Sequence, residues 1–239
     1  MCELISNNLK EIEETFKGVG VIINQRKDLK RLHKDNIFNR MYSVVLSSLV
    51  DVEILFLRLE KNLKNIEKIS IKINKRSQKE DKEEISKEGQ QLRKEMDKLK
   101  GEAFVDFKSV YIFLKIFFDK HVSLLRFLFN WRGIGDKSVT NFYNDLNSYD
   151  ETDGDIVFFK EKCLNRLKAI DVFITQYRDD YIMHDQTGHK EITRWVIFEN
   201  DNIRIFGKRP SITLNDMVFI LSNYINDTSE FIESKFKIK

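Results

Sequence analysis

Proline and glycine are scarce in this chain, and their scarcity constrains its fold more than any other feature. The 239 residues include one proline and nine glycines. Proline interrupts a helix because it lacks an N–H group, and glycine destabilises one because its backbone has more freedom to lose. A chain with so few of either residue can form long uninterrupted helices. We therefore expect a mainly α protein, built as a helical bundle.

Composition excludes several classes of protein. Hydrophobic residues make up 41% of the chain, enough to bury a core. The two cysteines, Cys2 and Cys163, cannot form a disulfide framework or a cysteine-based zinc site. The first residues lack a signal-peptide pattern, and charged residues interrupt the most apolar stretch, 105–129. We expect a cytoplasmic protein without a membrane segment. A net charge of +3 permits contact with nucleic acid but does not argue for it.

Residues 1–35 are expected to form an N-terminal helix followed by a basic connector. Apolar residues recur at helical spacing over 3–16, and Gly18 and Gly20 are predicted to end that helix. The basic stretch 26–34 is open to two interpretations. It is either a solvated connector or a surface that contacts backbone phosphates.

Residues 36–189 are expected to form the bundle itself. The pattern predicts a long helix from about residue 36, a protruding charged helical hairpin over 72–100 that turns near Ser77, and an aromatic helix over 103–131. The glycines of 132–135 are predicted to form a C-cap and a turn. Two more helices are predicted, one over 138–147 and one starting near Asp155.

After Gly188 the period changes from helical to extended. Residues 192–198 and 203–206 flank 199–202 and predict a small β-hairpin. Thr213 then caps a C-terminal helix. We expect this last region, 190–239, to pack on the bundle.

Few residues suggest a known type of catalytic or metal site. The four histidines are His33, His121, His184 and His189, and none lies in a hydrolase or metalloprotease motif. Cys163 falls on the apolar face of a helix, which favours a buried inert thiol. His184, Asp185 and His189 could in principle hold a metal ion, but no further strong ligand lies nearby in the sequence, so we expect no metal. No cofactor is expected either.

The segment 178–184 is exceptional because it places a guanidinium, two carboxylates, a tyrosine and an imidazole within seven residues. Such groups near a helix end commonly form caps and surface ion pairs. The order Arg178-Asp179, four residues, then His184 also resembles the signature of the HEPN superfamily. The helix Ser109–Lys120 is similar to the aromatic, Lys- and Asp-bearing core helix of bacterial HEPN-like proteins. The resemblance covers roughly Phe38 to His189.

This resemblance implies a HEPN-like helical bundle that forms a homodimer and acts as a metal-independent endoribonuclease of the defence or toxin type. RNA carries its own nucleophile, the 2′-hydroxyl. On this hypothesis His184 moves a proton, Arg178 binds the scissile phosphate and Asp179 orients one of them. Tyr177, Tyr181 and Lys120 are weaker candidates for contacts with the substrate. A protein inhibitor or partner is a further expectation.

Helix geometry and local charge qualify that hypothesis. Arg178 and His184 would lie about 120° apart on a straight helix, so either the helix breaks or a site forms between two subunits. Gln186 replaces the tyrosine that is modified in some HEPN proteins. Carboxylates at 179, 180 and 185 would repel phosphate. The alternatives are a catalytically silent HEPN-like dimer that acts as a scaffold or binds a ligand, and a helical protein unrelated to HEPN.

Overall fold

The computed structural model describes residues 2–77, 86–149, 153–177, 196–199, 202–205 and 212–237. Helices dominate these residues, which confirms the expected mainly α class. The helices are α1 (Cys2–Gln25), α2 (Lys30–His33), α3 (Ile37–Ser77), α4 (Lys87–Phe129), α5 (Val139–Ser148), α6 (Gly154–Phe159), α7 (Asn165–Tyr177) and α9 (Leu214–Phe236). A 3-10 turn, Lys34–Asn36, precedes α3, and a π-helical segment, Lys160–Leu164, joins α6 to α7.

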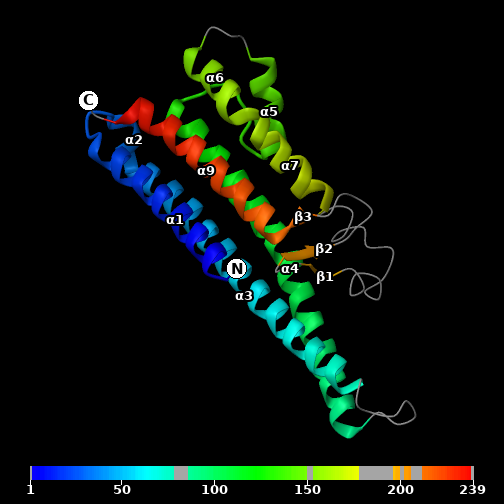
Figure 1. The fold of residues 1–239 in the computed structure, drawn as a ribbon. Coiled ribbons are helices and arrows are strands. Elements are labelled where there is room, and N and C mark those ends of the chain that lie inside the picture. The colour runs from blue at the N-terminus through cyan, green and yellow to red at the C-terminus, as the bar shows by residue number, and fades with distance from the viewer. Residues whose placement is uncertain are drawn as a thin grey trace.

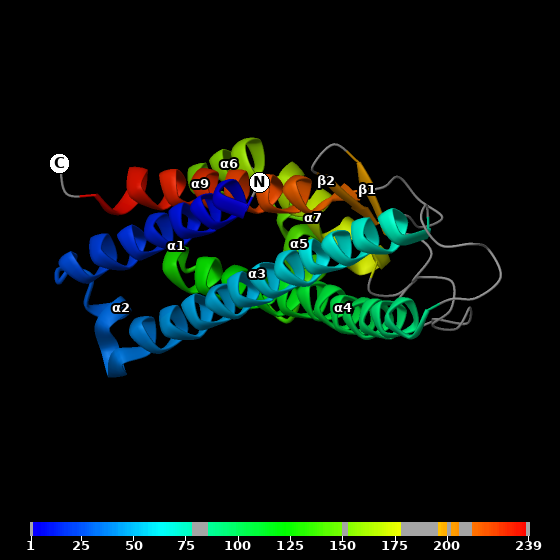
Figure 2. The same cartoon turned by 60° about the horizontal axis from the view of Figure 1, so that its bottom comes forward.

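The two longest helices, α3 and α4, pack against each other and run antiparallel through the whole molecule (Figure 1). α1 and α9 lie side by side along this pair, while α5 and α7 pack on α4 (Figures 1 and 2). One end of the α3–α4 pair extends beyond the other helices, at the bottom of Figure 1. This extension contains the charged segment predicted to be a hairpin. Residues 78–85, which connect the two helices, lie outside the described residues.

α1 continues through both glycines that were predicted to end it. Val19 and Ile23 are buried and extend the apolar stripe by two more turns, so the prediction of an end at Gly18 is wrong. Gly20 lies against α3, where an added Cβ would come 2.5 Å from Cζ of Tyr42. The tyrosine ring stacks on Phe16, and its hydroxyl donates to the Phe16 carbonyl at 3.1 Å. Glycine therefore allows α1 and α3 to approach closely here.

α4 is a single helix of 43 residues, although the sequence pattern divided it into a charged segment and a separate aromatic helix. Gly101 is exposed, and a Cβ there would contact nothing within 4 Å, so it causes no break. Ser86 caps the start by accepting a hydrogen bond from Gly89 N at 3.2 Å. The C-cap is Asn130, with a left-handed φ of 55°, rather than the glycines after it. Gly133, φ 84°, serves the turn that follows.

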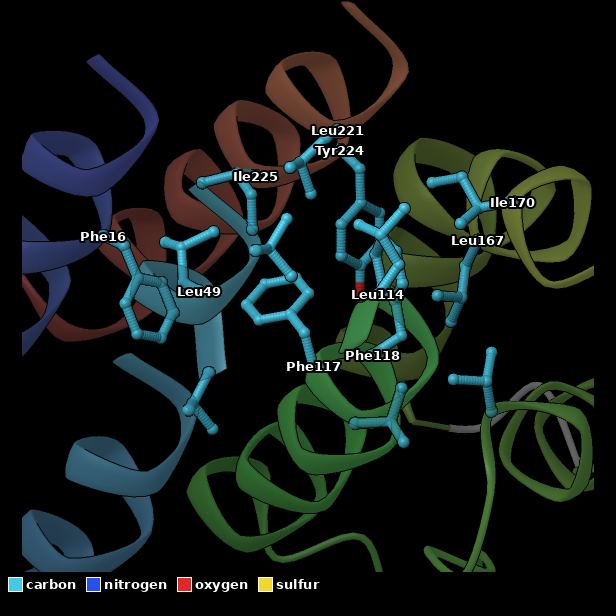
Figure 3. Packing of buried hydrophobic residues seen from close by; sticks show 14 of the residues in the cluster. Phe16, Leu49, Leu114, Phe117, Phe118, Leu167, Ile170, Leu221, Tyr224 and Ile225 are labelled. Atoms are coloured by element: carbon cyan, nitrogen blue, oxygen red, sulfur yellow. The ribbon is translucent and has the colours of Figure 1, made fainter. Parts of the chain in front are cut away.

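The core is one continuous cluster centred on α4. Phe117 and Phe118 project from α4 between the surrounding helices (Figure 3). The same cluster includes side chains from the predicted N-terminal, bundle and C-terminal regions; those labelled in Figure 3 include Phe16, Leu49, Leu167, Ile170, Leu221, Tyr224 and Ile225. Apolar burial therefore joins all three regions. α5, Val139–Ser148, closely matches its predicted range and is capped by Ser138.

A small antiparallel sheet precedes α9. Strand β1 (Val196–Glu199) pairs with β2 (Asn202–Ile205), with Val196 opposite Ile205, and β2 pairs with β3 (Ile212–Thr213). The sequence pattern placed Glu199 and Asn202 in a turn, whereas here they face each other as the last pair of the ladder. The strands are short and pack near the start of α9. α9 begins at Leu214, directly after Thr213, as predicted.

The two glycines of α1 provide a matched test of the packing. We expect Gly20→Ala to destabilise the protein by about 1–3 kcal/mol, because the new methyl group collides with a tyrosine ring held by stacking and a hydrogen bond. Gly18→Ala meets nothing within 4 Å and should stabilise the helix by about 0.5–1 kcal/mol. Urea unfolding followed by circular dichroism measures both. Equal effects in the two variants would contradict the close approach at Gly20.

Candidate functional site

The candidate catalytic residues follow α7 directly in the sequence. Tyr177 is the last residue of α7, and the next residues, which include Arg178, Asp179, Tyr181 and His184, lie outside the described residues. The candidate metal ligands Asp185 and His189 lie outside them too. The structure therefore describes α7, after which the motif segment starts, and the helices that hold α7 in place.

A buried ion pair fixes α7 to α4. Nζ of Lys115, on α4, lies 2.7 Å from Oδ1 of Asp171, on α7. Asp171 is 3% exposed and Lys115 is 9% exposed. Because each charge would be costly to bury alone, the pair constrains the position of one helix on the other. Asp171 precedes the motif arginine by seven residues, or about two helical turns.

Further contacts extend this pair into a network with α5. Oγ1 of Thr140 donates to Oδ2 of Asp171 at 2.6 Å, so both carboxylate oxygens are engaged. Lys115 also lies 3.2 Å from Oδ1 of Asp119, and that oxygen accepts from Val139 N at 2.8 Å, at the start of α5. Thr175, one turn before the motif, donates to Asp171 at 3.4 Å. The network therefore joins α4, α5 and α7 just before the motif segment.

Sequence reasoning missed this network. In the sequence, Lys115 and Asp119 stand out only as charged residues of the core helix, and Asp171 is not a candidate site residue. A usable signal was present: Lys115 and Asp171 each interrupt an apolar stripe, beside Leu114 and Ile170 respectively. Buried charges of opposite sign on two neighbouring helices are expected to pair. The pairing itself depends on which helices are neighbours, and a single sequence does not state that.

Lys120, the candidate substrate contact on α4, is exposed. Five residues separate it from Lys115, which places the two side chains about 140° apart around the helix. Lys120 therefore projects away from the network that holds α7.

His121 is buried in an aromatic environment. Its ring packs between Phe16 and Phe117, and its Nδ1 lies 2.9 Å from the hydroxyl of Tyr224 on α9. Nε2 is buried and has no hydrogen-bond partner among the residues that the structure describes. Complete burial lowers the pKa of His121 to about 3, so the ring stays neutral at neutral pH. A neutral, enclosed imidazole of this kind serves packing.

Cys163 lies in the π-helical segment before α7 and is fully buried. Burial raises the pKa of its thiol to about 12, so the nucleophilic thiolate is scarce at neutral pH. The expectation that Cys163 is buried is confirmed.

A basic hollow of about 460 Å³ lies where the chain turns from α1 into α3. It is open to solvent and is lined by Lys27, Lys30, Arg31, His33 and Lys34. Arg31 is committed to the fold, since its two terminal nitrogens donate to the carbonyls of Phe127 and Leu128 at 2.6 and 2.8 Å. It thereby binds the C-terminal end of α4, where the helix dipole favours a cation.

The described ranges contain no cluster of potential metal ligands and no helix suited to span a membrane. No set of three or more His, Cys, Asp or Glu side chains there is grouped as a metal ion would require. Nor does any helix within those ranges combine the length and apolar character needed to cross a bilayer.

Comparisons with known proteins identify no relative. The chain matches no family model, no curated protein and no solved structure.

The buried ion pair can be tested by removing one partner. Lys115→Met leaves the Asp171 carboxylate buried without its cation, so we expect a loss of about 3–5 kcal/mol in the free energy of unfolding. Replacing both residues, as Lys115→Met with Asp171→Leu, should cost less than Lys115→Met alone. Urea unfolding of each variant gives these values. Lys120→Met, on the exposed side of the same helix, is the control and should change stability by less than about 0.5 kcal/mol.

The pKa of His121 predicts a pH dependence of stability. The folded-state pKa, about 3, lies below the ordinary value of 6.5, so the unfolded chain takes up the proton first as the pH falls. Stability is therefore lost on acidification, by about 2 kcal/mol between pH 7 and pH 5. His121→Phe should remove this contribution and flatten the profile by that amount. Urea unfolding at pH 7, 6 and 5 measures both proteins, and parallel profiles would contradict the assignment.

Proposed function

We propose that the chain is a metal-independent endoribonuclease of the HEPN type, with a HEPN-like bundle and a site formed by Arg178 and His184. The observation that carries the proposal is the order Arg178-Asp179, four residues, His184, beginning at the residue after α7. The aromatic, Lys- and Asp-bearing helix α4 beneath α7 supports it. On this proposal the protein acts in defence or as a toxin in the cytoplasm.

The chemistry requires a base, an acid and a cation. The 2′-oxygen of RNA attacks the adjacent phosphorus while the bond from phosphorus to O5′ breaks, which leaves a 2′,3′-cyclic phosphate and a 5′-hydroxyl. His184 removes the 2′-hydroxyl proton or delivers one to the leaving O5′. Arg178 donates to the phosphate oxygens, whose negative charge grows in the transition state. Asp179 orients one of these groups, and Tyr177, Tyr181 and Lys120 contact the substrate.

The network beneath α7 gives the motif a rigid start. Asp171 and Thr175 lie seven and three residues before Arg178, and Asp171 is tied to Lys115 and Thr140. A fixed helix limits the positions that a following arginine can take, which is the preorganisation that phosphate binding needs. We further propose that two subunits contribute to one site, because Arg178 and His184 would diverge by about 120° along one straight helix.

Cleavage of RNA in the presence of EDTA tests the proposal. We expect the purified chain to cut single-stranded RNA in EDTA and to leave 2′,3′-cyclic phosphate ends, since the internal hydroxyl is the nucleophile. Arg178→Ala and His184→Ala should each lower the rate by at least about 100-fold. A substrate with a 2′-deoxy sugar at the cut site should resist. Denaturing gels and mass spectrometry of the products provide the readout.

Two control variants separate the motif from its surroundings. His189→Ala removes an imidazole five residues downstream of the motif, and Arg132→Ala removes an exposed guanidinium after α4. Both should keep the parent rate. Equal cutting by all five proteins would indicate a contaminating nuclease and contradict the proposal.

The second candidate is a catalytically silent HEPN-like dimer that acts as a scaffold or ligand-binding protein. It is favoured by the three carboxylates at 179, 180 and 185, which would repel phosphate near the motif. Absence of cleavage by the parent chain, together with a dimeric mass in solution, would favour this candidate.

A further inference from the structure

The projecting half of α3 is strongly basic. Residues 61–77 carry six basic side chains and one acidic side chain, Glu67, although the whole chain has a net charge of only +3. This half of α3 belongs to the part of the α3–α4 pair that extends beyond the other helices (Figures 1 and 2). The excess positive charge is therefore concentrated on a region that stands clear of the main bundle.

Four of the basic residues form a single line along the helix. Lys61, Lys68, Lys72 and Lys75 are exposed, and at 100° per residue they fall within about 60° of one another. We call this line the lysine face. It extends over about 21 Å of helix. The buried side chains Leu59, Leu63 and Ile66 lie on the opposite side of α3, which packs on α4.

The other two basic residues of the segment are already engaged. Lys64 lies 2.9 Å from the buried carboxylate of Glu60, and Arg76 pairs with Glu88 of α4 at 2.5 Å. None of the four residues of the lysine face makes an ion pair with a residue that the structure describes. Glu67 points about 100° away from Lys68. Lys64 and Arg76 therefore form ion pairs within the protein, whereas the four residues of the lysine face are exposed to solvent.

We infer that the lysine face binds the phosphate backbone of RNA, a choice of polyanion that rests on the proposed function. Its four ammonium groups stand at axial steps of about 10, 6 and 4.5 Å, and a flexible single strand can place successive phosphates against such a line. Such contacts are independent of base sequence and hold a long strand while another part of it reaches the motif. The lysine face is thus a backbone-docking surface, separate in sequence from residues 178–184.

The surroundings of the lysine face favour a nucleic-acid strand over a lipid surface or a protein partner. A helix that lies on a lipid surface inserts an apolar face, but the apolar face of α3 is buried against α4. Protein interfaces are centred on desolvated aromatic or arginine anchors and are depleted in lysine. A line of lysines without such an anchor fits a sugar-phosphate chain best.

Salt dependence of RNA binding tests this inference. The His184→Ala chain, used to suppress cleavage, is titrated with a labelled 30-nucleotide single-stranded RNA over a range of KCl concentrations. The test variant adds Lys61→Gln, Lys68→Gln, Lys72→Gln and Lys75→Gln, and glutamine keeps the helix propensity of lysine. The slope of log K against log [salt] should become shallower by about 0.7 for each lost contact, or about 3 in total. Affinity at 100 mM KCl should fall at least tenfold.

A control variant with the same change in charge shows whether position matters. It carries Lys→Gln changes at four exposed lysines elsewhere: Lys10, Lys137, Lys162 and Lys168. It should keep most of the parent slope, and circular dichroism verifies that both variants stay folded. An equal loss in the two variants, or an unchanged slope in the test variant, overturns the inference. Binding to phosphatidylserine vesicles but not to RNA also overturns it.

The outcomes separate this inference from the proposed function. If the lysine face governs RNA binding but the parent chain cuts no RNA, the lysine face stands as a docking surface and the nuclease proposal fails. If the parent chain cuts RNA in EDTA and the test variant binds with an unchanged slope, the nuclease proposal stands and the lysine face has no docking role.

Discussion

The pairing of α3 with α4 is the constraint on which the rest of the structure depends. Helices of 41 and 43 residues bury their apolar stripes against each other, and the remaining helices pack around this pair. α4 lies between α3, α7 and α9, so its C-terminal half is covered on most sides, and the aromatic residues there fill the core. Burial on several sides also means that any polar group on this part of α4 needs a partner or must stay neutral.

Two titratable residues of α4 meet this requirement in different ways. The ammonium group of Lys115 is paired with the carboxylates of Asp171 and Asp119. His121 lies among aromatic rings and stays neutral because burial lowers its pKa to about 3. The Lys115–Asp171 pair fixes the orientation of α7, and the ring of His121 fills space between α1, α4 and α9. Only the first bears on the proposed site, since α7 leads directly into the motif.

The two proposals together assign a role to the uneven distribution of charge along the chain. The motif segment holds several carboxylates, which weaken its own attraction for phosphate. The lysine face on α3 offers four exposed cations on a separate helix. A substrate strand held there would be brought to the motif despite the local repulsion, and the arginine would then contact one phosphate. Affinity and chemistry would thus depend on different regions of the protein.

The helical class and most helix positions follow from the amino-acid sequence alone, because apolar periodicity and the scarcity of proline and glycine are local properties. The sequence pattern correctly placed α3, α5 and the start of α9. It was wrong about the end of α1, since Gly20 serves contact with Tyr42, and it divided α4 in two. The candidate motif was visible as a short pattern, but Arg178 and His184 remain predictions. The pairing of Lys115 with Asp171 is visible only in the folded structure, because it joins residues 56 positions apart through the packing of separate helices.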